Sequence, residues 1–196
     1  MKHYLFLFLV IFIISIVAII GFVLFPSKLE REIVNNVHQL QSRKVYIPFH
    51  EFQLISLDKD SVKQQSPMKM IVYLDSYVCT ACAIKNLIVR WKDVVKMEEE
   101  YNGFLQFVFI VSPGNNDINN VSSILEQNHF HHSIYWDYSD AFIKANPHIP
   151  LKGAYHTFLL NEKDSVVLVG SPIENKKINV LFRKIIKEKM DSKNII

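Results

Sequence analysis

The two cysteines of the chain stand close together, at Cys79 and Cys82, separated by Thr80 and Ala81. They follow an apolar run at 70–74 and open a segment with helical periodicity. Two thiols at this spacing can form a disulfide with each other, and the amino end of a helix favours the thiolate of the first one. Because so short a ring gives little entropic stabilisation, the spacing predicts a working redox pair rather than a structural cross-link.

The elements that must position this pair are a strand before it and a helix after it. The apolar density of 68–74 and 104–111 predicts two buried strands, and 81–101 has the period of a helix. Its buried stripe is expected to comprise Ile84, Leu87, Ile88, Trp91, Val94 and Val95. Strand, helix and strand in this order predict a parallel crossover unit.

The second half of the chain is predicted to continue with short elements and an antiparallel hairpin. Helices are expected near 121–127 and 139–145, with a short strand at 133–136 between them. Strands at 155–160 and 166–169 are joined by a turn-forming run, which indicates a hairpin. The order of elements predicts an α/β fold with a central mixed sheet, and a final amphipathic helix packs on it.

The amino-terminal run from Tyr4 to Phe25 contains no charged residue. As a helix it would span about 33 Å, enough for a bilayer core of about 30 Å. It lacks a good small-residue cleavage site, which favours an uncleaved transmembrane anchor over a signal peptide. Because a thiol outside the pair could mispair in an oxidising space, the cysteine usage places the domain outside the cytoplasm.

These patterns divide the chain into three predicted parts. Residues 1–26 are the predicted membrane anchor, 27–67 a juxtamembrane helix, an edge strand and a linker, and 68–196 the folded domain. The 22 Lys and Arg residues nearly balance the 19 Asp and Glu residues, which argues against a nucleic-acid partner. The basic face of the last helix is expected to be solvated.

The run 71–74 leading into the Cys79–Cys82 pair, together with the distal segments 157–161 and 166–170, resembles the thioredoxin superfamily. The similarity is greatest to the membrane-anchored, periplasm-facing thiol-disulfide oxidoreductases and redoxin-like (TlpA-like) proteins of bacteria. The resemblance implies a thioredoxin-like fold with a helical insertion, an exposed nucleophile at Cys79 and a buried resolving thiol at Cys82. It implies no cofactor, with thiols and disulfides of cell-envelope proteins and a membrane electron donor as partners.

The resemblance covers about residues 68–188, and its implied location is the inner membrane, with a single pass and the domain facing the periplasm or cell exterior. Two positions near the pair depart from the family. Val78 stands where Trp usually precedes the first cysteine, and Tyr73 stands where thioredoxin has a buried acid. Asp75 lies nearby and is expected to cap the loop between strand and helix.

The loop expected to face the substrate departs further. The family has a cis-proline followed by Thr, whereas this chain has Tyr155, His156 and Thr157. Since a non-proline cis bond costs about 3–4 kcal/mol, a trans bond is expected before Tyr155. Tyr155 or His156 could instead reach the thiols as a hydrogen-bond donor or, for His156, as a metal ligand.

Three alternatives to a disulfide reductase remain open. Cys79, Cys82 and His156 could bind zinc or copper, although a structural zinc site needs a fourth ligand. Ser76 fits the Ser or Thr of peroxidases three residues before the reactive cysteine, but the expected activating Arg is missing. The departures also suit a thioredoxin-like binding module with little turnover. The histidines at 129, 131 and 132 are expected to be surface loop residues.

Overall fold

The computed structural model describes residues 2–24, 28–55, 66–75, 80–92, 94–113, 118–130, 132–151 and 153–193. The chain divides into two compact units, Met1–His38 and Gln39–Ile196, and each is described by itself. The second unit thus begins well before residue 68, the expected start of the domain. Its additional residues contribute a strand to the sheet.

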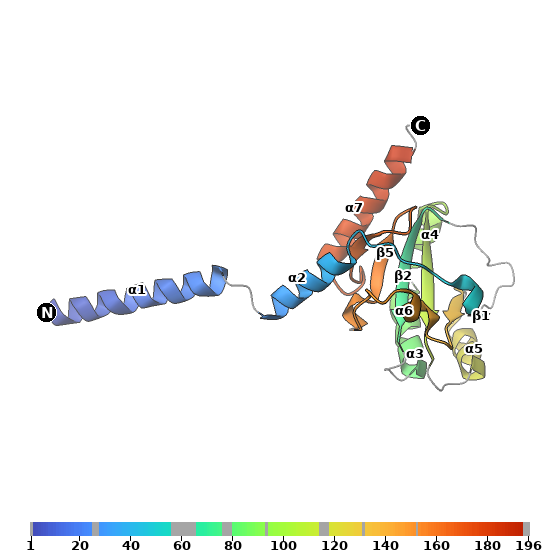
Figure 1. Cartoon of the computed structure of the whole chain (residues 1–196), viewed down its shortest axis with the longest axis horizontal. Coiled ribbons are helices and arrows are strands. Elements are labelled where there is room, and N and C mark those ends of the chain that lie inside the picture. Colours follow the sequence, from blue (N-terminus) through green and yellow to red (C-terminus); the bar gives the residue numbers. More distant parts are fainter. Residues whose placement is uncertain are drawn as a thin grey trace. The chain divides into compact units, whose positions relative to one another are not determined.

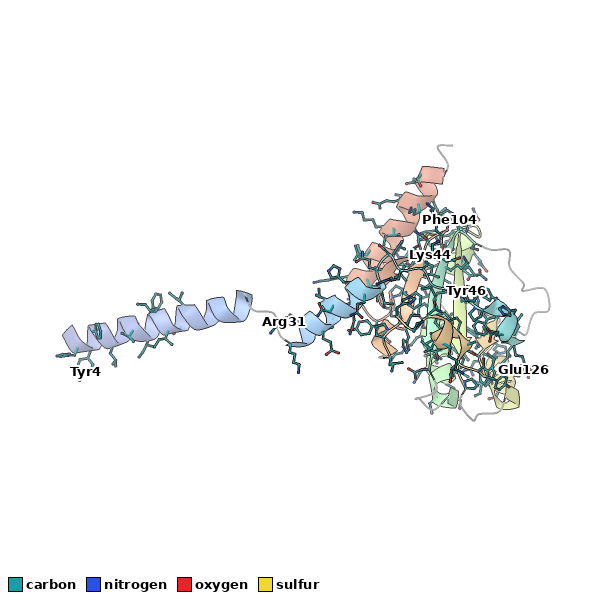
Figure 2. The ribbon with its side chains drawn as sticks, viewed as in Figure 1. Tyr4, Arg31, Lys44, Tyr46, Phe104 and Glu126 are labelled. Carbon is teal, nitrogen blue, oxygen red and sulfur yellow. The ribbon has the colours of Figure 1, made fainter. Side chains whose placement is uncertain are left out.

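The first unit contains α1 (Lys2–Leu24) and most of α2 (Lys28–Leu40). Exposed apolar side chains of α1 include Tyr4, Phe6 and Phe8, and Tyr4 lies near the amino end of the helix (Figure 2). None of the described helical residues form a segment with the length and hydropathy that a bilayer span requires. The membrane anchor therefore stays a prediction.

The second unit alternates strands and helices around one sheet (Figure 1). Its strands are β1 (Gln53–Ile55), β2 (Met68–Leu74), β3 (Leu105–Val111), β4 (Ile134–Trp136), β5 (Thr157–Leu160) and β6 (Val166–Val169). Its helices are α3 (Thr80–Trp91), α4 (Met97–Glu100), α5 (Ile118–Gln127), α6 (Ala141–Ala145) and α7 (Lys176–Lys193), with short 3-10 turns η1 (Phe49–Glu51) and η2 (Gly153–Tyr155).

The six strands form one mixed sheet in the order β1-β4-β3-β2-β5-β6. β2, β3 and β4 are parallel, and β5 runs antiparallel to both β2 and β6. β2, α3 and β3 form the predicted crossover, and β5 and β6 form the predicted hairpin. A mixed sheet with these connections and flanking helices fits the thioredoxin-like fold.

The residues of β2 and β3 alternate between two buried layers, which explains why both strands are apolar throughout. Met70 and Phe107 belong to the main core cluster, which also includes residues of α3, α5 and α7. Phe182 and Ile186 of α7 are fully buried in this cluster. On the alternate positions, Tyr73 contacts Phe142 of α6, with ring centroids 5.1 Å apart. The sheet is therefore the middle layer of the unit.

The chain between α2 and β1 crosses the sheet from the β6 side to the β4 edge (Figure 1). Near its start, Val45 N donates to Asp164 O at 2.8 Å, and Lys44 and Tyr46 lie along it (Figure 2). Midway, the Asn146 side chain accepts from Tyr46 N and donates to Tyr46 O. The segment then ends in β1, which pairs with β4 and is an edge strand of the sheet.

The long helix expected at 81–101 is wrong, because the helix ends at Trp91 and a short α4 follows. In α4, the buried carboxylate of Glu98 accepts a hydrogen bond from the Phe107 amide of β3. β4 pairs with β3 only from Phe109 onward, so Glu98 binds an amide that β4 does not reach. Its other oxygen lies 3.4 Å from His132 Nε2. His132 is therefore half-buried rather than a surface residue.

Candidate functional site

Each of the three parallel strands is followed by a polar residue at its carboxyl end. Asp75 follows β2, Ser112 follows β3 and Asp137 follows β4. The backbone ladder continues into these positions, since Ser112 N donates to Leu74 O at 2.8 Å. The carboxyl ends of parallel strands are the usual place for a binding site in an α/β sheet. The polar residues therefore gather at the end of the sheet from which the chain leads to the cysteine pair.

Cys82 lies in the first turn of α3, and its side chain is exposed. The expectation of a buried Cys82 is therefore wrong. Its physical reason is the helical period: the buried side of α3 is formed by Ile84, Leu87 and Ile88, and Cys82 is about 200° around the helix from Ile84. Cys79, like Ser76 and Val78, lies outside the described residues.

His156 is buried, with 3% of its surface exposed, and both of its ring nitrogens have defined neighbours. Nε2 lies 2.9 Å from the carbonyl oxygen of Pro150, and Nδ1 lies 3.4 Å from Oδ2 of Asp75. Burial lowers the pKa of His156 below its ordinary value, and the hydrogen bond to Pro150 and the charge of Asp75 oppose this change. The structure thus brings together two predicted site residues, Asp75 and His156.

Tyr73 occupies the family's acid position, and it lies against the His156 ring with centroids 5.1 Å apart. Burial raises the pKa of its phenol above the ordinary value, and the negative charges of Asp140, Asp137 and Asp75 raise it further. A hydrogen bond with Ser112 acts in the opposite direction. Tyr73 therefore stays neutral and cannot supply the carboxylate that it replaces.

A pocket of about 220 Å³ opens beside these residues. Its polar wall is formed by Tyr73, Asp75, Asp140, Lys144 and His156. Two aliphatic side chains, Ile143 and Leu151, complete the lining, and Leu151 is largely exposed. The pocket is large enough for several water molecules or a small side chain.

The α6 side of the pocket is fixed by a buried carboxylate. Asp137 is fully buried and accepts hydrogen bonds from the backbone amides of Ala141 at 2.8 Å and Phe142 at 2.9 Å. Asp140, in the left-handed region with φ 55°, accepts from the Ser112 hydroxyl. These contacts join the start of α6 to the ends of β3 and β4, so the pocket wall is part of the sheet's framework.

The predicted substrate loop is more buried than a substrate-facing loop should be. Tyr155 is 6% exposed, and Thr157 already pairs with Val72 as the first residue of β5. No cis peptide bond occurs among the described residues, as expected for the bond before Tyr155. No group of three potential metal ligands occurs within the described part of the chain. His156 is thus the member of this loop that borders the pocket.

Asp137, Asp140 and Lys144 were not predicted as site residues from the sequence. A signal was present, because a polar residue follows each buried apolar run that forms a parallel strand. Recognising it required the knowledge that 133–136 is parallel to the two longer strands. The backbone carbonyl of Pro150 leaves no such signal, since the sequence cannot show which carbonyl a side chain meets.

Comparisons with known proteins give similar structures but no related sequence. No protein-family profile matches the chain, and no curated protein is significantly similar to it. A thioredoxin-like protein solved in its oxidised form has a TM-score of 0.47 at 12% identity, covering 74% of this chain and 97% of that one. A domain of a possible thiol-disulfide isomerase from Cytophaga hutchinsonii has a TM-score of 0.45 at 12% identity, covering 76% and 97%.

A third similar structure is a thioredoxin-like protein from Porphyromonas gingivalis, with a TM-score of 0.44 at 11% identity, covering 76% of this chain and 90% of that one. All three TM-scores lie below 0.5. The fold assignment therefore rests on the strand order and the connections described above.

Proposed function

We propose that the protein is a thiol-disulfide oxidoreductase that uses Cys79 and Cys82 on protein disulfides. The observation that carries this proposal is the position of Cys82. It is exposed in the first turn of the helix that follows the central strand β2, and its partner thiol precedes it by three residues. An exposed thiol at a helix amino end is accessible for exchange, and the helix dipole favours a thiolate there.

The proposed reaction has two exchange steps. The Cys79 thiolate attacks one sulfur of the substrate disulfide, that disulfide breaks, and the departing sulfur takes up a proton. The Cys82 thiol then loses its proton and attacks the Cys79 sulfur, which releases the second substrate thiol. The substrate gains two electrons, and the protein is left with a Cys79–Cys82 disulfide that a donor must reduce.

We propose reduction as the working direction, with cell-envelope proteins as substrates and a membrane electron donor to restore the dithiol. Thr80 and Ala81 add no charge that would strongly stabilise the thiolate, and a strongly oxidising pair needs such stabilisation. Residues 4–25 are proposed as a lipid-bilayer anchor in the inner membrane, with the second unit outside the cytoplasm. The exposed apolar side chains of α1 support this, because large exposed apolar surfaces mark membrane or protein contacts.

The function is tested with the full chain and two single-cysteine variants. Wild type is expected to reduce oxidised glutathione, and Cys82→Ser to accumulate mixed disulfides with envelope proteins, because its nucleophile cannot be released. Cys79→Ser is the matched control and should trap far fewer. If wild type reduces no disulfide and Cys82→Ser traps none, the oxidoreductase proposal fails and a binding module is favoured. Fractionation with alkaline carbonate tests the anchor separately.

A further inference from the structure

The outer face of α7 exposes aliphatic as well as basic side chains. The helix packs on the core of the second unit through Phe182 and Ile186, which are fully buried. On its other side Val180 is 67% exposed and Leu181 is 46% exposed. The sequence predicts a solvated basic face for this helix, whereas the structure shows two adjacent large aliphatic residues exposed on that face.

The basic residues of α7 lie around these aliphatic side chains. The segment 176–187 contains five Lys or Arg residues and no Asp or Glu, although the whole chain is nearly neutral. At 3.6 residues per turn, Lys176 and Lys184 each lie about 40° around the helix from Val180, one turn before it and one turn after it. The first three turns of α7 therefore present a positive surface with an aliphatic centre.

Most of this positive charge is not neutralised by neighbouring acidic side chains. Lys184 Nζ lies 3.8 Å from Oε1 of Glu188, a pair in which both side chains are largely exposed. Within the described part of the chain, Lys176, Lys177 and Lys187 have no ion-pair partner. Their ammonium groups are therefore available to an anionic partner.

The composition of the face indicates which kind of anionic partner it fits. The cores of protein–protein interfaces are depleted in Lys and enriched in aromatic residues and Arg. Single-stranded nucleic acids are bound by stacking on aromatic side chains, but Phe182, the aromatic residue of α7, is fully buried. Lys beside exposed Val and Leu instead suits a lipid surface, where the stem of Lys lies along apolar groups and its ammonium reaches the headgroups.

We propose that this outer face of α7 binds the surface of a lipid bilayer that contains anionic phospholipids. The face comprises Lys176, Lys177, Val180, Leu181, Lys184 and Lys187. The ammonium groups contact the headgroup phosphates, and the two aliphatic side chains enter the boundary between headgroups and acyl chains. This inference goes beyond the proposed function, because it uses neither cysteine and does not require α1 to span a bilayer.

The test measures how fast individual lysine amines of the full chain are acetylated in the presence of lipid vesicles, using mass spectrometry. Vesicles of phosphatidylcholine alone are compared with an equal mixture of phosphatidylcholine and phosphatidylglycerol. Lys176, Lys177 and Lys187 should react severalfold more slowly with the anionic vesicles, because the bilayer covers them. Lys163, which is exposed in the turn between β5 and β6, is the internal control and should react equally with both. Salt at about 1 M should remove the protection, because it screens the contact.

A triple variant tests the electrostatic part of the contact. Replacing Lys176, Lys177 and Lys187 by Gln should lower the equilibrium constant for membrane contact by on the order of 10²-fold, as judged by the loss of protection at Lys184.

The matched control for the triple variant replaces Lys85, Lys92 and Lys163 by Gln. It removes the same charge from exposed positions outside α7 and should keep the protection. Protection at Lys184 that is equal in the two triple variants would overturn the inference.

Substitution of Val180 tests the aliphatic part. Val180→Glu places a carboxylate among the lysines and should abolish the protection, whereas Val180→Leu should keep it. Because Val180 is largely exposed, neither change should disturb the fold.

Two further outcomes would overturn the inference. One is equal reactivity of Lys176, Lys177 and Lys187 with both kinds of vesicle. The other is protection by duplex DNA or polyglutamate but not by anionic vesicles, which would assign the face to a nucleic acid or an acidic protein. Reduction of glutathione is measured separately, so its failure would overturn the proposed function and leave this result unchanged.

Discussion

The two ends of strand β2 each carry a carboxylate beside a basic side chain, but the two pairs are built differently. At the amino end, Lys69 Nζ donates to Asp164 Oδ1 at 2.7 Å, and the Lys69 side chain is 10% exposed. At the carboxyl end, Asp75 and His156 lie 3.4 Å apart beside a pocket. The first pair has its proton in place and neutralises a buried charge. The second lies in the wall of a pocket that a ligand can enter.

The two pairs therefore differ in their expected roles: the pair at the amino end of β2 stabilises the fold, and the pair at the carboxyl end lies near the site of the chemistry. A buried ammonium needs its counter-ion in all conditions, so the amino end should respond in stability and not in activity. The carboxyl end should respond in activity and in its dependence on pH. The predictions that follow test this separation, from the largest expected effect to the smallest.

The largest effect is expected at the cysteine pair itself. Cys82→Ala should lower steady-state reduction of oxidised glutathione, with a reductant supplied, to the rate of the uncatalysed reaction, because the mixed disulfide cannot be resolved within the protein. Its side chain is exposed, so the free energy of unfolding should change by less than about 0.5 kcal/mol. Turnover retained in this variant would show that Cys79 and Cys82, beyond the carboxyl end of β2, do not act as a redox pair.

The next effect is on the packing behind the pocket, where Phe142 of α6 contacts the lining residue Tyr73. Phe142 is fully buried against Tyr73, so Phe142→Ala should lower the free energy of unfolding by about 3–5 kcal/mol. Phe142→Leu retains more volume and should cost less. Urea unfolding of both variants measures the difference. A cost below about 1 kcal/mol for Phe142→Ala would mean that the packing between α6 and β2 is not rigid.

A smaller effect is expected at the amino end. Asp164→Asn replaces the charged partner of Lys69 by a neutral amide and should cost about 1 kcal/mol of stability, because Asp164 is half-exposed and its charge is partly screened. Glutathione reduction should be unaffected. Loss of activity without loss of stability here would remove the distinction between the two ends.

The smallest effect is the dependence of stability on pH that His156 causes. Its pKa is lowered in the folded chain, so the unfolded chain takes up this proton first as the pH falls. Its contribution is fully present above about pH 6.5 and is lost as the pH falls from there through the folded pKa. His148, whose pKa is also lowered by burial, adds to the same trend. Urea unfolding at several pH values should show a shallower decrease in His156→Gln; an equal decrease would contradict this contribution.

The order of the elements could be predicted from the sequence because each of these elements has a recognisable local pattern. The apolar runs that became β2 and β3, and the turn-rich link between β5 and β6, specify their structure without reference to distant residues. The burial of Glu98 could not be predicted, because it depends on an amide of β3 that β4 does not reach. A buried Lys69 within an apolar strand likewise depends on Asp164, which is 95 residues away.

The site was predictable in part for the same reason. The Cys79–Cys82 spacing and the unusual loop at Tyr155 and His156 are visible as local sequence. The pairing of His156 with Asp75 was not, since it requires β5 to lie beside β2. The exposure of Cys82 follows from the helical period of α3 and could have been derived from the sequence; the family resemblance implied burial instead.

The central claim is that Cys79 and Cys82 exchange electrons as one dithiol/disulfide unit. It is tested most directly by equilibrating the full chain with glutathione at graded ratios of its reduced and oxidised forms and counting alkylated thiols by mass. We predict a single two-electron transition in which both thiols are lost together, with a midpoint roughly between −270 and −120 mV. Two thiols that stay alkylatable at every ratio, or that react separately with glutathione, would contradict the claim.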